Sequence, residues 1–272
     1  MLKQHCTVNN IRIGGGAPVR LMGVINCSPE SFYRGSYTPV GRIYDRALAM
    51  LDSGGADMID LGARSTAPGS PPITVAEEAA RVDAALSELD GTGITVSVDT
   101  RYAEVLEVCL RHDIHAVNDI SGLADECYAR AVADSGLPVF AMASFREPGD
   151  AVGLAATREA LGMVVTRCAL LGIDEYVLDP AVGRWVPARA NEDDWELCRN
   201  FQSFSAFSRP LLAAVSRKTF IGDLLGRVPE DRLAGTLALT TMLVAAGAAV
   251  VRSHDVAETA DLLRVYAKMR QR

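Results

Sequence analysis

Short apolar runs alternate with longer amphipathic stretches over most of the chain. The short runs are rich in valine, isoleucine and leucine, which is typical of strands buried on both faces in a parallel sheet. Eight of them are predicted as strands, over residues 20–26, 57–63, 95–100, 116–121, 138–144, 175–180, 210–216 and 249–254.

The stretches between these runs have the spacing of amphipathic helices. We expect helices over residues 41–53, 75–89, 102–112, 158–171, 193–204, 230–246 and 256–268. Local signals agree with these limits. Thr74 and Glu77 have the spacing of a capping box at a helix start. Gly54 and Gly55 mark a helix end, because glycine tolerates the left-handed backbone found there.

Strands that alternate with helices predict parallel β-α-β units. Eight such units in one chain predict an α/β fold of the (β/α)8 TIM barrel type, as a single domain over residues 1–272. An open, doubly wound sheet is the alternative. The first residues, 3–19, predict a short hairpin around Gly14, Gly15 and Gly16 that closes the bottom of the barrel.

Composition narrows the class of protein. The chain has 272 residues, 49% of them hydrophobic, and a net charge of −7 at pH 7. The hydrophobic fraction excludes a disordered protein. The negative net charge argues against a nucleic-acid partner, because proteins that bind nucleic acids usually have a basic surface. The six cysteines form no CxxC pair and the start, MLKQHCTVNN, has no apolar leader. Both features predict a cytoplasmic protein with reduced thiols.

One uncharged stretch, residues 234–251, has the length of a membrane span. Its threonines and the sequence AAGAA favour a different interpretation, a buried helix followed by a buried strand. We therefore expect no contact with a membrane.

Polar side chains cluster where the predicted strands end. In a parallel barrel these ends share one rim, where active sites lie. Asp99, Asn118 and Asp179 offer acceptors and an amide that suit an aminopyrimidine-like ring edge with several N–H donors. Lys218 complements a ring carbonyl. The fifth strand is apolar there, and Met142 and its neighbours predict a wall for a flat ligand.

A second group of strand-end residues suits an anion. Arg252 and His254 follow the last strand, and Asn26 ends the first. An arginine, a histidine and an amide are what a phosphate or its divalent metal requires. A leaving phosphate then needs neutralisation of charge rather than a covalent nucleophile.

Seven motifs follow one another in the order and spacing found in dihydropteroate synthases, and the chain resembles this family of pterin-binding barrels over nearly its whole length. The motifs are LMGVINCSPESFYRGS, DMIDLGARSTAPGS, SVDT, VNDISG, VLDPAVG, SRKTFIG and VRSHDVAET. No single motif decides the matter, but seven in order are a strong signal.

The resemblance implies a reaction in which an arylamine nitrogen displaces diphosphate from 6-hydroxymethyl-7,8-dihydropterin diphosphate. It implies that the pterin is held by Asp99, Asn118, Asp179 and Lys218. The diphosphate would be held by Asn26, Arg252 and His254, with Mg²⁺ near Asn26. Ser216 and Thr66 would lie near the arylamine. A homodimer formed through the later helices is the family expectation.

Three positions depart from the family pattern. Ala67 stands where the family has arginine, Ala143 where it has histidine, and Arg184-Trp185 where it often has phenylalanine. The added charge suggests an arylamine that carries a phosphate, such as the ribofuranosyl-aminobenzene phosphate of methanopterin biosynthesis, bound by Arg184 and Arg189. Plain 4-aminobenzoate stays the other choice.

Two other functions remain open from the sequence. A pterin-dependent methyltransferase would share the pterin contacts but needs no diphosphate site. A non-catalytic pterin-binding homologue is compatible with the replacements at Ala67 and Ala143. Release of diphosphate distinguishes the synthase from both.

Overall fold

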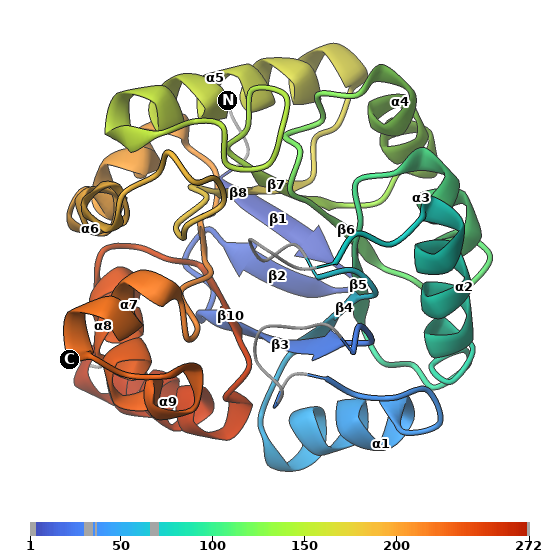
Figure 1. The fold of residues 1–272 in the computed structure, drawn as a ribbon, viewed down its shortest axis with the longest axis horizontal. Coiled ribbons are helices and arrows are strands. Elements are labelled where there is room, and N and C mark those ends of the chain that lie inside the picture. Colours follow the sequence, from blue (N-terminus) through green and yellow to red (C-terminus); the bar gives the residue numbers. More distant parts are fainter. Residues whose placement is uncertain (1–3, 30–34, 36, 66–70, 271–272) are drawn as a thin grey trace.

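Eight parallel strands form the barrel that the hydrophobic pattern predicts, and helices surround it (Figure 1). The structure is a computed structural model that describes residues 4–29, 35, 37–65 and 71–270. The barrel strands are β3 (Arg20–Asn26), β4 (Met58–Gly62), β5 (Val96–Asp99), β6 (Ala116–Asp119), β7 (Val139–Met142), β8 (Tyr176–Asp179), β9 (Leu212–Ala213) and β10 (Val250–Ser253).

The order of the strands shows how the barrel closes. Neighbouring strands run β8-β7-β6-β5-β4-β3-β10-β9, all parallel. A parallel bridge between Leu178 and Leu211 then joins β8 to the residue before β9. The alternative of an open sheet is therefore wrong. Because every strand runs the same way, all carboxyl ends meet at one rim.

Helices follow the strands around the outside. Their bounds are α1 (Ile43–Leu48), α2 (Val75–Leu86), α3 (Ala103–Cys109), α4 (Glu126–Ser135), α5 (Gly153–Leu171), α6 (Asn191–Arg199), α7 (Thr219–Leu225), α8 (Leu233–Ala245) and α9 (Val256–Arg270). Two were not expected from the sequence, α4 and the short α7. The signals for α4 were present, since Asp125 caps its start and left-handed Gly136 ends it.

The N-terminal hairpin is confirmed, but its turn is not where the sequence analysis placed it. Strand β1 (His5–Val8) pairs antiparallel with β2 (Ile11–Gly14). The turn between them is Asn9–Asn10, with φ of 42° and 65°. Asparagine tolerates this left-handed conformation, which a tight two-residue hairpin turn requires. Gly14 is the last residue of β2, and Gly15 and Gly16 follow it, so the three glycines do not form the tip of the hairpin.

The hairpin covers the bottom of the barrel as predicted. Its buried side chains are Cys6, Val8 and Ile13, and they form one cluster with inward-facing residues of the strands. Those residues are Met22, Met58, Ala116, Phe140, Val177, Leu212 and Val250. This end of the barrel is closed by apolar packing, which leaves the opposite rim for a ligand.

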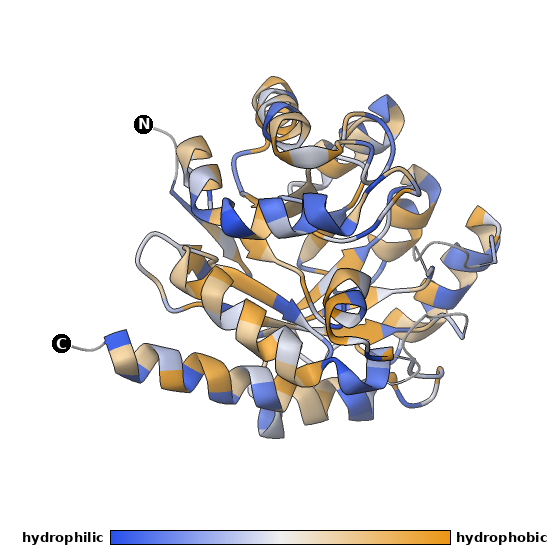
Figure 2. Cartoon of the chain, turned by 60° about the vertical axis from the view of Figure 1, so that its left-hand side comes forward, coloured by the Kyte–Doolittle hydropathy of each residue, from blue (hydrophilic) through white to orange (hydrophobic). Residues whose placement is uncertain are grey.

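The uncharged stretch of residues 234–251 forms most of α8 and the start of β10, as predicted. Figure 2 shows the hydrophobic residues gathered on the strands and mixed with hydrophilic ones on the helices. Within the described ranges, no helix combines the length and the hydropathy needed to span a membrane.

Candidate active site

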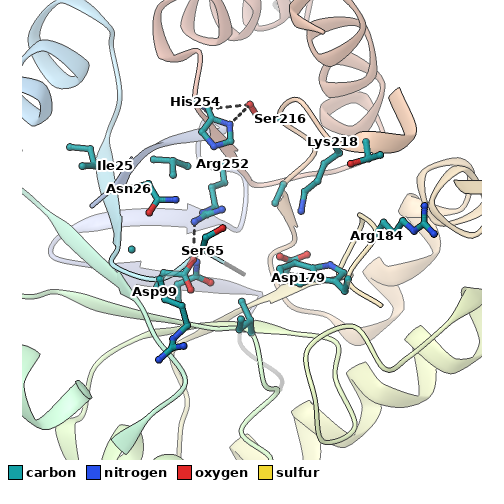
Figure 3. Close-up of a pocket in the computed structure, with 18 of the residues that line it drawn as sticks. Ile25, Asn26, Ser65, Asp99, Asp179, Arg184, Ser216, Lys218, Arg252 and His254 are labelled. Atoms are coloured by element: carbon teal, nitrogen blue, oxygen red, sulfur yellow. Dashed lines mark hydrogen bonds and ion pairs between the residues drawn. The ribbon is translucent and has the colours of Figure 1, made fainter. Parts of the chain in front are cut away.

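A cavity of about 410 Å³ opens among residues at the carboxyl ends of the barrel strands. Nine of the eleven site residues predicted from the sequence line it. They are Asn26, Asp99, Asn118, Asp179, Arg184, Ser216, Lys218, Arg252 and His254. Figure 3 labels all of them except Asn118 and shows the labelled side chains around the cavity.

The other two predicted site residues are Thr66 and Met142. Thr66 lies outside the described residues, as does Ala67. Met142 is 1% exposed and is not among the residues that line the cavity, so its contact with a ligand stays a prediction. All four residues of β7 are buried, whereas Ile120, which follows the neighbouring β6, lines the cavity.

A buried ion-pair network lies at the floor of the cavity. The Arg252 guanidinium donates from Nε to Asp60 Oδ2 at 2.6 Å and from Nη2 to Asp99 Oδ2 at 2.9 Å. Asn118 Nδ2 also donates to Asp60 Oδ2, at 3.0 Å. Figure 3 shows Arg252 pointing to Asp99. Arg252 therefore belongs with the acidic pterin group of the prediction rather than apart from it with Asn26 and His254.

Asp99 titrates near neutrality in this setting. Burial raises the pKa of its carboxyl to about 7, the Arg252 charge opposes that rise, and the nearby Asp60 charge adds to it. A carboxylate at this position is a strong acceptor above pH 7 and loses that property as it takes up a proton.

Lys218 and Asp179 form the opposite side of the cavity. Lys218 Nζ lies 4.7 Å from the centre of the Trp185 ring, a cation–π contact. The side chain passes Gly183, where an added Cβ would lie 2.8 Å from Nζ, so a larger residue there would displace the end of Lys218. Burial lowers the pKa of Lys218 to about 8, against the opposing charge of Asp179. Burial likewise raises the pKa of Asp179.

His254 is a neutral imidazole in this site. Burial, followed by the charges of Arg252 and Lys218, lowers its pKa to about 3. Its Nδ1 lies 2.9 Å from Ser216 Oγ, which also accepts the His254 backbone N–H at 3.2 Å. His254 therefore offers hydrogen bonds to a ligand rather than positive charge.

Two arginines near the rim are tied to carboxylates. Arg64 lines the cavity and donates to Glu78 Oε2 and to the Ile73 carbonyl oxygen. Arg189 is 1% exposed and donates from Nε to Asp194 at 2.9 Å. The expectation that Arg189 contacts an arylamine phosphate is thus wrong, because the folded loop buries the side chain. Arg184 is exposed and does line the cavity.

Asn26 was predicted to hold a magnesium ion. Its Oδ1 accepts from the Ser28 backbone N–H and hydroxyl, and within the described ranges no cluster of three metal-ligating side chains exists. The part of the chain that the structure describes therefore supplies no cluster of carboxylate, histidine or cysteine side chains for Mg²⁺. An amide oxygen does fit as a single ligand of an ion held mostly by substrate phosphates and waters, which is a common form of magnesium binding.

Two further residues make contacts at this site, Asp60, for which the sequence indicated no role, and Trp185. Asp60 stands within the predicted strand of residues 57–63, and a carboxylate amid an apolar strand is rarely buried without a partner. Trp185 stands in the loop after the sixth predicted strand, whose place at the rim makes contact with a ligand plausible from the sequence. Its indole N–H donates to the Ala181 carbonyl oxygen at 3.1 Å, which holds the ring beside Lys218.

Comparison with known proteins decides the family. The sequence model described as pterin binding enzyme matches residues 22–254. The dihydropteroate synthase of Escherichia coli K12 is 32% identical over 257 residues, which cover 90% of this chain and 89% of that protein. The chain belongs to the dihydropteroate synthase family of pterin-binding enzymes. The predicted class, a transferase of this type, is confirmed.

Other members of the family agree in sequence and structure. The dihydropteroate synthase of Mycobacterium leprae is 33% identical over 267 residues, with 92% of this chain and 93% of that protein covered. The Xanthomonas albilineans dihydropteroate synthase structure with 4-aminobenzoic acid has a TM-score of 0.86 at 30% identity and covers 99% of both chains. The Yersinia pestis dihydropteroate synthase structure with a sulfonamide drug has a TM-score of 0.88 at 28% identity, over 98% of this chain and 99% of that one.

Proposed function

We propose that this chain condenses 6-hydroxymethyl-7,8-dihydropterin diphosphate with an arylamine in the cavity at the strand ends and releases diphosphate. The observation that carries the proposal is the convergence of three acceptor side chains and one ammonium group on a single cavity. Asp99, Asn118 and Asp179 are suited to ring N–H donors, and Lys218 to a ring carbonyl or nitrogen.

The diphosphate half of the substrate lies beside Asn26 and His254 in this proposal. Both residues line the same cavity as the acidic floor. Neutral His254 donates or accepts hydrogen bonds there, and the charge of Arg252 acts from the floor. Positive charge and oriented donors stabilise the negative charge that develops on the leaving group.

The reaction is a substitution at the exocyclic methylene of the pterin. The C–O bond to diphosphate breaks, the arylamine nitrogen forms the C–N bond, and the amine loses one proton to solvent. The chain holds both reactants in line and shields the cation-like methylene, so positioning and electrostatics supply the rate. A Mg²⁺ ion held by the diphosphate and Asn26 Oδ1 would neutralise charge on the leaving group.

The arylamine is bound on the side of the cavity that Arg184, Trp185 and Pro187 form. Arg184 is an exposed cation that suits the carboxylate of 4-aminobenzoate. Two arginines, Arg184 and Arg189, favoured an amine that carries a phosphate. Arg189 is buried against Asp194, so only Arg184 of the two remains to bind such a phosphate. We therefore favour 4-aminobenzoate.

An amine panel tests this proposal. Diphosphate release is measured with the pterin diphosphate and either 4-aminobenzoate or the ribofuranosyl-aminobenzene phosphate. We expect release with 4-aminobenzoate and a kcat/KM at least about 10-fold higher than with the phosphorylated amine, an energy difference of about 1.4 kcal/mol. The reverse preference would assign the methanopterin-type reaction. Absence of release with both amines would favour a methyltransferase or a non-catalytic binder.

We also propose that the chain forms a homodimer through α8 and α9. A second hollow lies between these helices, lined by Leu237, Ala238, Thr241, Leu262, Val265, Tyr266 and Met269 among others. Val265 is 65% exposed and Met269 79% exposed. Apolar side chains gathered in one exposed patch are typical of an interface between subunits.

Sedimentation tests the dimer. Val265→Asp places a charge in the patch and is expected to convert a wild-type dimer into a monomer. Leu170→Asp, at a side chain of α5 that is 83% exposed, is the matched control and should leave the dimer intact. A wild-type monomer at micromolar concentration, or dissociation by both substitutions, would contradict this interface.

A further inference from the structure

Asp60 lies beneath the cavity, in the middle of β4, and does not line it. The residue is 0% exposed. Its Oδ2 accepts hydrogen bonds from two residues that do line the cavity, Asn118 and Arg252. Its Oδ1 is buried and has no hydrogen-bond partner among the residues that the structure describes. Burying a carboxylate that has one oxygen without a hydrogen bond costs free energy of folding. The contacts of Asp60 with the two cavity residues suggest what this cost serves.

The contact with Asn118 fixes the orientation of that amide. A carboxylate only accepts hydrogen bonds, so the NH2 group of Asn118 must face Asp60. The carbonyl oxygen Oδ1 of Asn118 then occupies the other branch of the amide. Since Asn118 lines the cavity, the atom it has available for a ligand is an acceptor.

The contact with Arg252 fixes a guanidinium in the same way. Nε donates to Asp60 at 2.6 Å and Nη2 donates to Asp99 at 2.9 Å, so two carboxylates define the plane of the group. A planar guanidinium held at two points cannot turn without breaking one of these ion pairs. Asp60 thus touches both a neutral and a charged group of the pterin site.

We propose that Asp60 is a positioning residue that sets the donor and acceptor pattern of the pterin site, although it touches no substrate. By orienting Asn118 as an acceptor, it selects a ring edge that presents N–H donors and rejects one that presents acceptors. The inference rests on the proposed function, since it concerns the same pterin site.

Asp60→Asn tests the inference, because an asparagine at this position can face Asn118 with either its NH2 or its oxygen. Binding is measured by calorimetry without an amine, using 6-hydroxymethylpterin, its 2-oxo analogue and its N3-methyl analogue. We expect the wild type to reject at least one analogue by 100-fold or more, because buried acceptors without donors are costly. In Asp60→Asn that ratio should fall at least about 10-fold, the size of one lost neutral hydrogen bond.

Asp57→Asn is the matched control. Asp57 precedes the same strand, pairs with Arg20 at 3.0 Å and accepts the Leu21 N–H, but at the opposite end of the barrel. This variant should lose stability and keep the wild-type selectivity. Equal loss of affinity for all three ligands in Asp60→Asn would show a merely structural role and overturn the inference.

A measurement on the wild type covers the case in which Asp60→Asn does not fold. The Asn118 side-chain NH2, assigned in a nitrogen-15 spectrum of the ligand-free protein, should exchange its protons slowly because one is bonded to a buried carboxylate. Fast exchange would overturn the inference. A wild type that binds none of the three pterins would instead contradict the proposed function itself, so the two failures are distinct.

Discussion

Replacing Arg252 by methionine is expected to lower the stability of the barrel and to abolish pterin binding. The substitution leaves the carboxylates of Asp60 and Asp99 side by side without their shared cation. Removing one partner of a buried ion pair costs about 3–5 kcal/mol. Arg252 is 22% exposed, so we expect the lower value. A loss of about 3 kcal/mol lowers the melting temperature by roughly 6 °C or more in a protein of this size.

The loss in Arg252→Met should depend on pH. Arg252 opposes the rise in the pKa of Asp99, so without it that pKa moves further above about 7. When the pKa of a carboxyl is higher in the folded state than in the unfolded state, the folded state loses stability as the pH rises above the pKa of the unfolded state. The loss in Arg252→Met should therefore be larger at pH 8 than at pH 5. Melting temperatures at pH 5 and pH 8 measure this. Arg264→Met, which removes an exposed pair on α9, is the control. Equal melting temperatures for the two variants would refute the buried network.

Replacing Lys218 by alanine is expected to lower kcat/KM for the pterin diphosphate by about 10- to 100-fold. Hydrogen bonds to a charged group contribute about 1.5–3 kcal/mol, which corresponds to that range. Lys218 contacts Trp185 and passes Gly183 in a way that leaves its ammonium group at the cavity. Steady-state kinetics should show the loss mainly in KM, because Lys218 holds the ring rather than the leaving group. Lys268→Ala, an exposed residue of α9, should have no effect.

The same variant should change the pH profile. In the wild type, kcat/KM rises as Asp99 loses its proton near pH 7 and falls as Lys218 loses its own near pH 8. Such a profile reports the acid and base of the free enzyme. Lys218→Ala should keep the acid limb and lose the alkaline limb. A variant that keeps both limbs would show that another group titrates near pH 8.

The barrel could be predicted because its strands are buried on both faces and read as unbroken apolar runs. Residues 20–26, for example, form β3 over the predicted bounds. The length of the seventh predicted strand was wrong. Residues 210–216 were expected to be extended, but only Leu212–Ala213 pair as a strand. The Asn9–Asn10 turn was missed because three consecutive glycines gave a stronger local signal nearby.

The site could be located from the sequence, but its internal pairing could not. Strand ends of a parallel barrel share one rim, so polar residues there converge whatever their partners. Arg252 and Asp60 are 192 positions apart in the chain. They come into contact because β10 and β4 lie on either side of β3, an order that the sequence pattern does not reveal.

The most direct test of the proposed reaction is the mass of its product. Purified protein is incubated with the pterin diphosphate, 4-aminobenzoate and Mg²⁺, and the mixture is analysed by mass spectrometry together with a diphosphate assay. The proposed function predicts one pterin–arylamine adduct, joined at the methylene, for each diphosphate released. Tight binding of the pterin diphosphate without any adduct, with no amine giving product, would contradict it and identify the chain as a pterin-binding protein that does not catalyse the condensation.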